Sequence, residues 1–249
     1  MSDEKRTVIV HYHIYKNSGT SFDHVLTESF GDRHQLFDGP FPFFGIDQVQ
    51  LDRIIRRRPA AVAFSSHQIM LPQPTSLHYR TLAAMFLRHP ILRIGSVYRF
   101  KRAHADGTPT SAAAQKYDFA DWLRHCFKTP GEAGHVSNAQ TRHVSAPYMQ
   151  TPLHQRHNGV LSYDLDTARR NLNSVEMLGR TEYFERDVRR FTRIAEAHGL
   201  SLQGPSEVRH NVTEHAEGST EDRVAALLAE LPDDLAQRLV AANAQDMAL

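Results

Sequence analysis

The residues best suited to binding or catalysis are Lys16, Thr20 and Ser21. They lie between an apolar run and a segment with helical spacing. The apolar run 7–14 predicts a buried strand, and the apolar spacing within 21–30 predicts a helix. Backbone N–H groups at a helix N-terminus and the positive end of its dipole favour a bound phosphate or sulfate. Lys16 adds a mobile positive charge, and the two hydroxyl groups add donors. The segment therefore predicts an anion-binding loop.

The spacing within this loop separates it from the Walker A loop of ATP- and GTP-binding proteins. In that loop, GxxxxGK[ST], the lysine directly follows a glycine, whereas Lys16 precedes Gly19 by three residues. The difference disfavours an ordinary nucleoside-triphosphate site. A kinase or another P-loop phosphotransferase nevertheless stays open as the alternative enzyme.

A second candidate anion site follows the strand expected at 82–87, which ends at Arg88. A guanidinium group can bind a phosphate through two parallel hydrogen bonds. A helix is expected from about Pro90, and Ser96 lies about two helical turns beyond Arg88. Arg93 belongs either to the surface of this helix or to its packing. Arg88 and Ser96 are the candidates for contact with a phosphate.

Both segments resemble the sulfotransferases that use 3′-phosphoadenosine-5′-phosphosulfate (PAPS), specifically the carbohydrate type that includes the heparan and uronyl 2-O-sulfotransferases. The sequence IYKNSGTS at 14–21 is similar to the family's 5′-phosphosulfate loop, roughly HIPKTGGTS. The sequence RHPILRIGSVY at 88–98 is similar to its 3′-phosphate motif, roughly RDPxxRxxSxY, with His89 where the family usually has aspartate.

The resemblance implies a role for each matching residue. Lys16 would bind the phosphosulfate and stabilise charge on the departing bridging oxygen, and Arg88 and Ser96 would bind the 3′-phosphate. The residues implied in binding the phosphosulfate are Lys16, Asn17, Ser18, Gly19, Thr20 and Ser21.

Shorter matches occur in the same order as in the family. They are NAQTR at 138–142, similar to the family's NxQTR, the segment 168–185, similar to AxxNL…GxTExF, and HNVT at 210–213, similar to a loop that closes over the nucleotide. Asn138, Gln140 and Arg142 either line a pocket or serve as helix caps and surface residues.

His67 is the candidate general base, because it directly follows an apolar strand candidate. The position resembles the glycine-histidine pair of the uronyl 2-O-sulfotransferases, whose histidine is the base, with Ser66 in place of the glycine. An unperturbed pKa near 6.5 suits removal of a proton from an attacking alcohol. The alternative bases are His11, His13 and His104.

His11 and His13 alternate with Tyr12 on the first strand, which is also a pattern for metal ligands. No third ligand stands at a diagnostic spacing beside them. We therefore expect no metal.

Composition favours an ordinary globular protein. The chain has 249 residues, 41% hydrophobic and 23% charged, enough for one α/β domain or two small ones. No linker divides it, so we expect one domain over 1–249 with a helical C-terminal part from about 164. A formal net charge of +1 gives no indication of nucleic-acid binding. Cys126 is the single cysteine, so an intrachain disulfide is impossible and we expect an inert, buried thiol.

The chain has no apolar stretch of about 18 residues, so no membrane span is expected, and the short apolar run after a charged N-terminus is not typical of a signal peptide. We expect a cytoplasmic protein.

Two strand-then-helix units with anion chemistry at the strand ends predict a parallel sheet with its ligand at the carboxyl edge. The fold expected is α/β, a single domain with a central parallel sheet flanked by helices, which the resemblance makes a P-loop-like sulfotransferase fold. We expect a third strand at 60–64, a loop at 105–114, and helices at 47–57, 119–127, 164–173, 182–198, 221–231 and 232–244.

The resemblance implies transfer of a sulfuryl group from PAPS to a hydroxyl of a carbohydrate or glycoconjugate, with 3′,5′-ADP as product. The implied partner is a small-molecule or glycan acceptor. Besides the phosphotransferase, an inactive nucleotide- or glycan-binding module stays open, and His89 is the feature that favours it.

Overall fold

The computed structural model describes residues 5–41, 44–145, 155–157, 160–205 and 218–249, with the backbone alone at 155–157. The chain forms two compact units that interleave along the sequence. Unit 1 consists of Met1–Leu87, His143–Gln150 and Asp166–Val212, and unit 2 of Arg88–Arg142, Thr151–Leu165 and Thr213–Leu249. That these units make a single domain stays a prediction.

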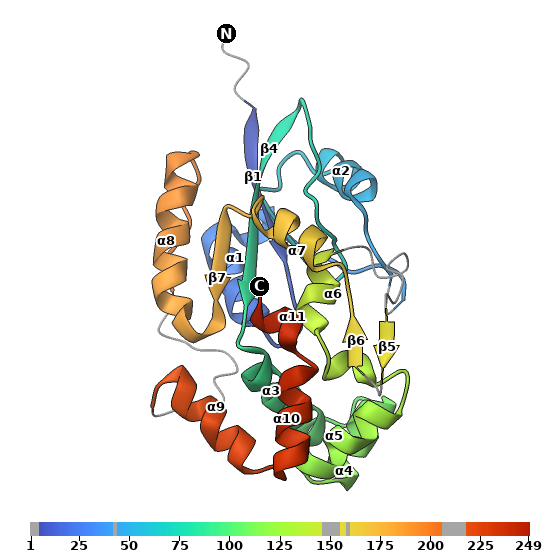
Figure 1. Cartoon of the computed structure of the whole chain (residues 1–249). Helices are drawn as coiled ribbons and strands as arrows, with labels where there is room; N and C mark the ends of the chain where they lie inside the picture. The colour runs from blue at the N-terminus through green and yellow to red at the C-terminus, as the bar shows by residue number, and fades with distance from the viewer. Residues whose placement is uncertain (1–4, 42–43, 146–154, 158–159, 206–217) are drawn as a thin grey trace. The chain divides into compact units, whose positions relative to one another are not determined.

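Unit 1 is built on a five-stranded parallel sheet with the strand order β2-β3-β1-β4-β7, of which β1, β4 and β7 are labelled in Figure 1. The strand order reverses at β1, and the carboxyl ends of strands at such a reversal are where ligands bind in open α/β sheets. The α/β fold with a central parallel sheet is thus confirmed. The strands are β1 (Arg6–Tyr12), β2 (His34–Leu36), β3 (Ala63–Ser66), β4 (Tyr79–Leu87) and β7 (Met177–Arg180).

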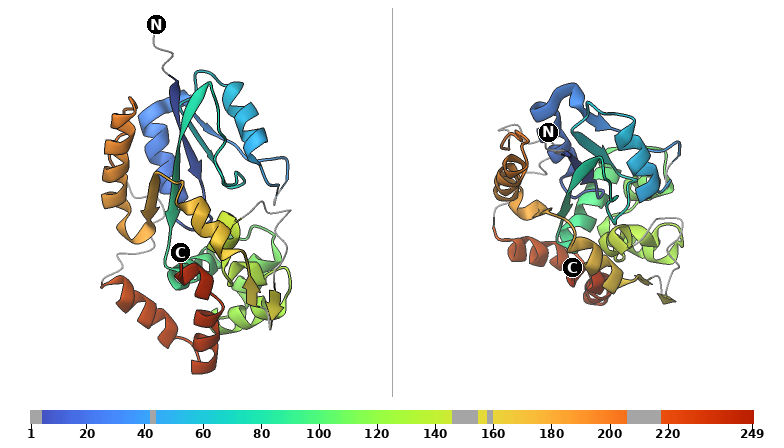
Figure 2. Two further views of the ribbon diagram at one scale, coloured as in Figure 1. Left: turned by 45° about the horizontal axis from the view of Figure 1, so that its top comes forward. Right: turned by 90° about the horizontal axis from the view of Figure 1, so that it is seen from above.

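Helices cover both faces of this sheet, with α1 (Gly19–Phe30) and α8 (Phe184–Ala197) on one face and α2 (Gln48–Arg56) on the other (Figures 1 and 2). Phe22 of α1, Phe86 of β4 and Phe191 of α8 are fully or almost fully buried, with ring centroids 5.3–5.7 Å apart. Burial of each such side chain contributes about 2 kcal/mol, which holds α1 and the loop before it against the sheet.

Unit 2 is mainly helical. It also contains an antiparallel pair of short strands, β5 (Gln155–His157) and β6 (Val160–Ser162). The first four residues of α6 (Ala139–Ser145) belong to unit 2, and its remainder belongs to unit 1. The other helices of unit 2 are α3 (Pro90–Ala103), α4 (Pro109–Lys116), α5 (Phe119–Lys128), α9 (Thr220–Ala229), α10 (Asp233–Ala241) and α11 (Ala244–Met247). Helix α7 (Leu165–Leu172) lies in unit 1 apart from its first residue, and single 3-10 turns occur at Gly31–Arg33, Ala133–His135 and Thr181–Tyr183.

Two local expectations were wrong. The loop expected at 105–114 contains the start of α4, because the Thr108 side chain accepts a hydrogen bond from the Ser111 N–H and Pro109 occupies a first-turn position that suits proline. The segment expected to be helical from about 164 also contains β7, whose four residues pair with β4 at the edge of the sheet. A strand this short gives no periodic signal in the sequence.

The expectation for Cys126 agrees with the structure. Cys126 is fully buried, and burial raises the pKa of its thiol, as an inert cysteine requires. Among the described residues, every helix is too short or too polar to cross a membrane.

A network of polar groups ties α1 to β2 and β3. Thr27 Oγ1 donates to the Asp23 carbonyl and accepts from His34 Nδ1, both at 2.9 Å. The proton on His34 is therefore on Nδ1, which leaves Nε2 to accept from the Ser65 hydroxyl at 2.9 Å. This arrangement requires a neutral imidazole, and burial lowers the pKa of His34 to about 4.

We predict that the free energy of unfolding decreases as the pH falls from 6.5 towards 4. In that range unfolded His34, with an ordinary pKa of 6.5, gains a proton that the folded protein resists until about pH 4. One such group changes stability by about 1.4 kcal/mol per pH unit. Urea unfolding of wild type and His34→Gln across this range measures the difference, and the variant should show the shallower slope. Parallel pH profiles would contradict the prediction.

Candidate active site

The predicted anion-binding loop joins β1 to α1 and has an unusual backbone. Lys16 and Ser18 have φ angles of 66° and 61°, in the left-handed region, on either side of the buried Asn17. The Asn17 side chain donates to the carbonyl of Phe86 at 2.9 Å, which anchors the loop to the end of β4. Such conformations cost free energy, and this tether helps to hold them.

The loop ends at the N-terminus of α1, where Thr20 is exposed and Ser21 is half-buried. The first N–H groups of any α-helix have no acceptor within the helix, and the dipole makes this end positive. The first turn of α1 contains no acidic residue. These N–H groups and the helix dipole are a physical reason for the loop to bind phosphosulfate, which stays a prediction. The side chain of Asn17 has a different role, because it anchors the loop.

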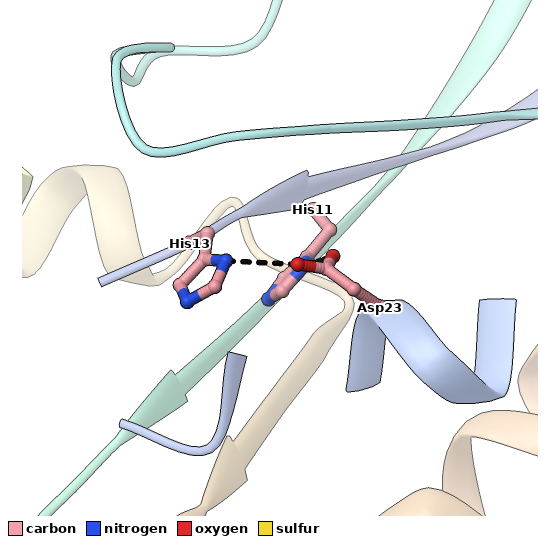
Figure 3. A group of neighbouring side chains, drawn as sticks. All are labelled: His11, His13 and Asp23. Carbon is pink, nitrogen blue, oxygen red and sulfur yellow. Dashed lines mark hydrogen bonds and ion pairs between the residues drawn. The ribbon is translucent and has the colours of Figure 1, made fainter. Parts of the chain in front are cut away.

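Behind the loop, Asp23 of α1 joins two histidines from the end of β1 (Figure 3). His11 Nδ1 lies 2.7 Å from Asp23 Oδ1, and His13 Nδ1 lies 2.9 Å from Oδ2. Because an ionised carboxylate can only accept, both imidazoles donate from Nδ1 and keep a lone pair on Nε2 when neutral. We call these three buried residues the His-Asp-His clamp.

The clamp also has a donor set that metals accept. Its two imidazoles and one carboxylate offer ligand atoms within 4.8 Å of one another. A metal bound at the Nδ1 atoms would have to replace the protons that now bond Asp23, because metal ligands must be deprotonated. The hydrogen bonds account for the arrangement by themselves, and the absence of a metal requirement stays a prediction.

His67, the predicted base, directly follows β3, and its side chain is 46% exposed. The Asp38 carboxylate holds it in two ways, by accepting from its backbone N–H at 3.0 Å and by lying 3.3 Å from Nδ1. The Ser66 hydroxyl donates to the same carboxylate at 2.7 Å, which orients Asp38. His67 Nε2 is therefore the nitrogen left to accept a proton.

The register of the sheet brings His67 to the clamp. Tyr12 of β1 pairs with Ser66 of β3, so the residues that follow them, His13 and His67, leave the sheet side by side. The His13 N–H donates to the Ser66 carbonyl at 3.1 Å, and the imidazoles of His13 and His67 stack with centroids 3.9 Å apart. Two histidines that are 54 residues apart in sequence thus form one site.

The titratable groups of this site affect one another. Burial alone would raise the pKa of Asp23, but His11 and His13 reverse this effect and hold it well below the usual range. Burial lowers the pKa of His13, and the hydrogen bond to Asp23 offsets only part of that shift. Burial and the neighbouring His13 lower the pKa of His67, whereas Asp38 acts in the opposite direction. His67 is therefore kept neutral and able to accept a proton.

Arg88, the first residue of unit 2, is held by Gln140. The Gln140 side chain accepts from the Arg88 N–H and donates to the Arg88 carbonyl, both at 2.9 Å. Ser96 is buried on α3, and buried Arg93 donates to the His135 carbonyl, so Arg93 packs inside unit 2.

The remaining residues singled out from the sequence have the following environments. Asn138 is buried and, with a φ angle of 45°, precedes α6, where it donates to the Leu161 carbonyl at 2.7 Å. Arg142 is half-buried in α6. His104 is exposed, with Nδ1 3.0 Å from the Phe100 carbonyl. The loop expected at 210–213 lies outside the described residues.

Sequence reasoning missed Asp23 and Asp38. Asp23 carried a signal, because it lies among Phe22, Leu26 and Phe30 on the apolar side of its helix, where a charged residue requires a buried partner. Asp38 lies in an irregular segment after β2 and carried no such signal.

Two comparisons relate the chain to other proteins. The model of the sulfotransferase family matches residues 2–249. A protein of Archaeoglobus fulgidus, named as an uncharacterized protein, is 27% identical over 248 residues, which cover 98% of this chain and 94% of the relative. The resemblance read from the loop and the Arg88 segment is thus confirmed at the level of the family, and the carbohydrate type stays a prediction. The chain belongs to the sulfotransferase family.

Proposed function

We propose that this protein transfers a sulfuryl group from PAPS to a hydroxyl of a carbohydrate or glycoconjugate acceptor, with His67 as the general base. The observation that carries the proposal is the half-exposed His67, held by Asp38 and stacked on His13 at the carboxyl edge of the sheet. Membership of the sulfotransferase family supports the reaction type. The acceptor class rests on the resemblance to the carbohydrate-type enzymes.

The hydrogen bonds of His67 leave one ring nitrogen able to accept a proton, as a base requires. Its Nδ1–H bonds Asp38, so Nε2 accepts the proton of the acceptor hydroxyl as that oxygen forms a bond to sulfur. The bond between sulfur and the bridging oxygen breaks at the same time, and its electron pair leaves on the phosphate of 3′,5′-ADP. Asp38 stabilises the imidazolium that results, as the carboxylate of a catalytic triad does.

Lys16 and the N-terminus of α1 supply the positive charge that this step requires. PAPS supplies an activated sulfuryl group, and charge grows on the bridging oxygen as that group leaves. Lys16 stabilises this charge, and the N–H groups and hydroxyls of Gly19, Thr20 and Ser21 hold the phosphosulfate. The left-handed residues of the loop and the Asn17 tether fix its shape before the donor binds.

Arg88 and Ser96 are proposed to bind the 3′-phosphate, the group that distinguishes PAPS from ATP. Gln140 supports this assignment, because its two hydrogen bonds fix the backbone of Arg88 and so the point from which its side chain extends. A backbone held in this way loses less entropy when the guanidinium group binds a phosphate bidentately.

We predict that the protein binds 3′,5′-ADP more tightly than 5′-AMP or ATP in calorimetric titrations without added metal. Arg88→Ala should weaken 3′,5′-ADP binding about tenfold or more and leave 5′-AMP binding within about twofold, because a charged hydrogen bond to the 3′-phosphate is lost. Gln140→Ala should show a smaller loss with the same selectivity.

The matched control is Arg124→Ala, which removes an arginine whose ion pair with Asp121 lies on the surface of α5. It should bind 3′,5′-ADP like wild type. ATP binding equal to or tighter than 3′,5′-ADP binding would contradict the proposal and favour the phosphotransferase. Tight 3′,5′-ADP binding without transfer to any acceptor would favour the inactive module.

We predict that His67→Ala lowers sulfuryl transfer from PAPS to a panel of hydroxyl-bearing glycans and simple alcohols by about a hundredfold or more. Its affinity for 3′,5′-ADP should stay within about twofold of wild type, because the imidazole is assigned to the acceptor side. Release of 3′,5′-ADP in the presence of acceptor measures the rate. His78→Ala, which removes an exposed histidine, is the control. Full activity of His67→Ala would exclude it as the base.

A further inference from the structure

His13 contacts three functional parts of unit 1 at once. Its Nδ1 bonds Asp23 in the clamp, one face of its ring stacks on His67, and its Cδ2–Nε2 edge lies against Gly19 of the loop. The ring of His11 stacks in the same series, with its centroid 5.2 Å from that of His13. His13 itself is only 5% exposed, so it is too enclosed to receive the proton of an acceptor.

The contact with Gly19 explains why this position of the loop is a glycine. A Cβ placed on Gly19 would lie 2.0 Å from Cδ2 and 2.1 Å from Nε2 of His13, far inside van der Waals contact. Gly19 is the first residue of α1 and has no left-handed φ, so space and not backbone conformation demands the glycine. The imidazole of His13 and the start of α1 are therefore packed directly together.

The clamp makes this contact rigid. Asp23 lies on α1, the helix that begins at Gly19, and its Oδ2 holds His13 Nδ1 at 2.9 Å. His13 is thus fixed to α1 at two points, one hydrogen bond and one close packing contact. A displacement of the helix start would move the imidazole, and the imidazole would move the His67 ring that stacks on it.

From these contacts we propose that His13 is a positioning residue that couples the placement of the anion-binding loop to the orientation of the His67 ring. Asp23 fixes the tautomer and the ring plane of His13, Gly19 provides the room for the ring, and the ring face supports His67. The part of the inference that concerns catalysis rests on the proposed function, whereas the physical coupling does not.

The coupling should be detectable in the pKa of His67. The titratable groups that face it in the described residues are His13 from the end of β1, Asp38 from the segment after β2, and Asp23 from α1. His13 in turn faces Asp23, His11 and Asp38. Two imidazolium rings stacked face to face repel each other, so the pair holds one proton more readily than two.

The test measures the pKa of His67 by NMR of its imidazole Cε1–H, in four proteins: wild type, Gly19→Ala, His13→Asn and the double variant. Asparagine keeps an N–H donor near the position of Nδ1, so His13→Asn retains a bond to Asp23 while it removes the ring. His13→Asn should raise the pKa of His67 towards its ordinary value of 6.5, because the His67 ring loses its cover and the neighbouring imidazole that lowers its pKa.

Gly19→Ala should shift the same resonance in the histidine background, because its methyl group displaces the ring of His13. In the His13→Asn background the added methyl group should have little effect on His67, because the ring that it would strike is gone. This non-additivity is the result expected of a positioning residue. Equal shifts from Gly19→Ala in both backgrounds, or an unchanged His67 titration in His13→Asn, would overturn the proposal.

Kinetics provide a second readout. In His13→Asn, kcat should fall about tenfold with the KM for PAPS within about twofold, and the pH profile of kcat should shift with the NMR titration. His24→Ala, which removes a partly exposed histidine from the same helix, should leave the His67 titration unchanged. If His67→Ala proves fully active, the base assignment fails while the NMR cycle still decides the coupling.

The last experiment adds zinc to the EDTA-treated protein and follows the histidine resonances by NMR. If zinc shifts the His11 and His13 resonances at one equivalent, the trio is a metal site and the positioning role is overturned. Unchanged resonances agree with a hydrogen-bonded clamp.

Discussion

The arrangement of unit 1 depends on the buried carboxylate of Asp23. An ionised group removed from water is stable only when it is paired and fully hydrogen-bonded, and here two imidazole N–H groups supply the pairing. These bonds can form only if α1 lies at one position along the end of β1. The start of the helix, the loop before it and the orientation of His13 follow from that single constraint.

The parallel sheet brings a second histidine, His67, next to His13. The carboxyl ends of β1 and β3 are level, because Tyr12 pairs with Ser66, and the residues that follow them meet above the same edge. His67 is thereby stacked on a ring that already has a fixed plane, while Asp38 holds its other nitrogen. A half-exposed histidine on an irregular segment gains an orientation that its own backbone would not give it.

In unit 2, a neutral side chain holds the backbone of Arg88. Arg88 stands just after a strand, and the Gln140 amide bonds both its N–H and its carbonyl, much as a neighbouring strand would. Gln140 is fixed in turn, because Asp246 near the C-terminus accepts from its backbone N–H and from that of Thr141. The NAQTR segment that matched the family thus has a physical role, which is to hold the arginine that precedes α3.

The sequence alone determined the parallel α/β class, the loop after β1 and the helix that follows Arg88, because hydrophobic periodicity and residues such as Gly19 and Pro90 act over a few positions. It did not determine β7 or the start of α4, since a four-residue strand has no period and Thr108 acts as a cap only in the right conformation. The pairings of Asp23, Asp38 and Gln140 emerged only from the tertiary structure, although the sequence had already marked Gln140 as a candidate. Their contacts with His13, His67 and Arg88 join residues 10–52 positions apart, and only strand register and helix docking set such contacts.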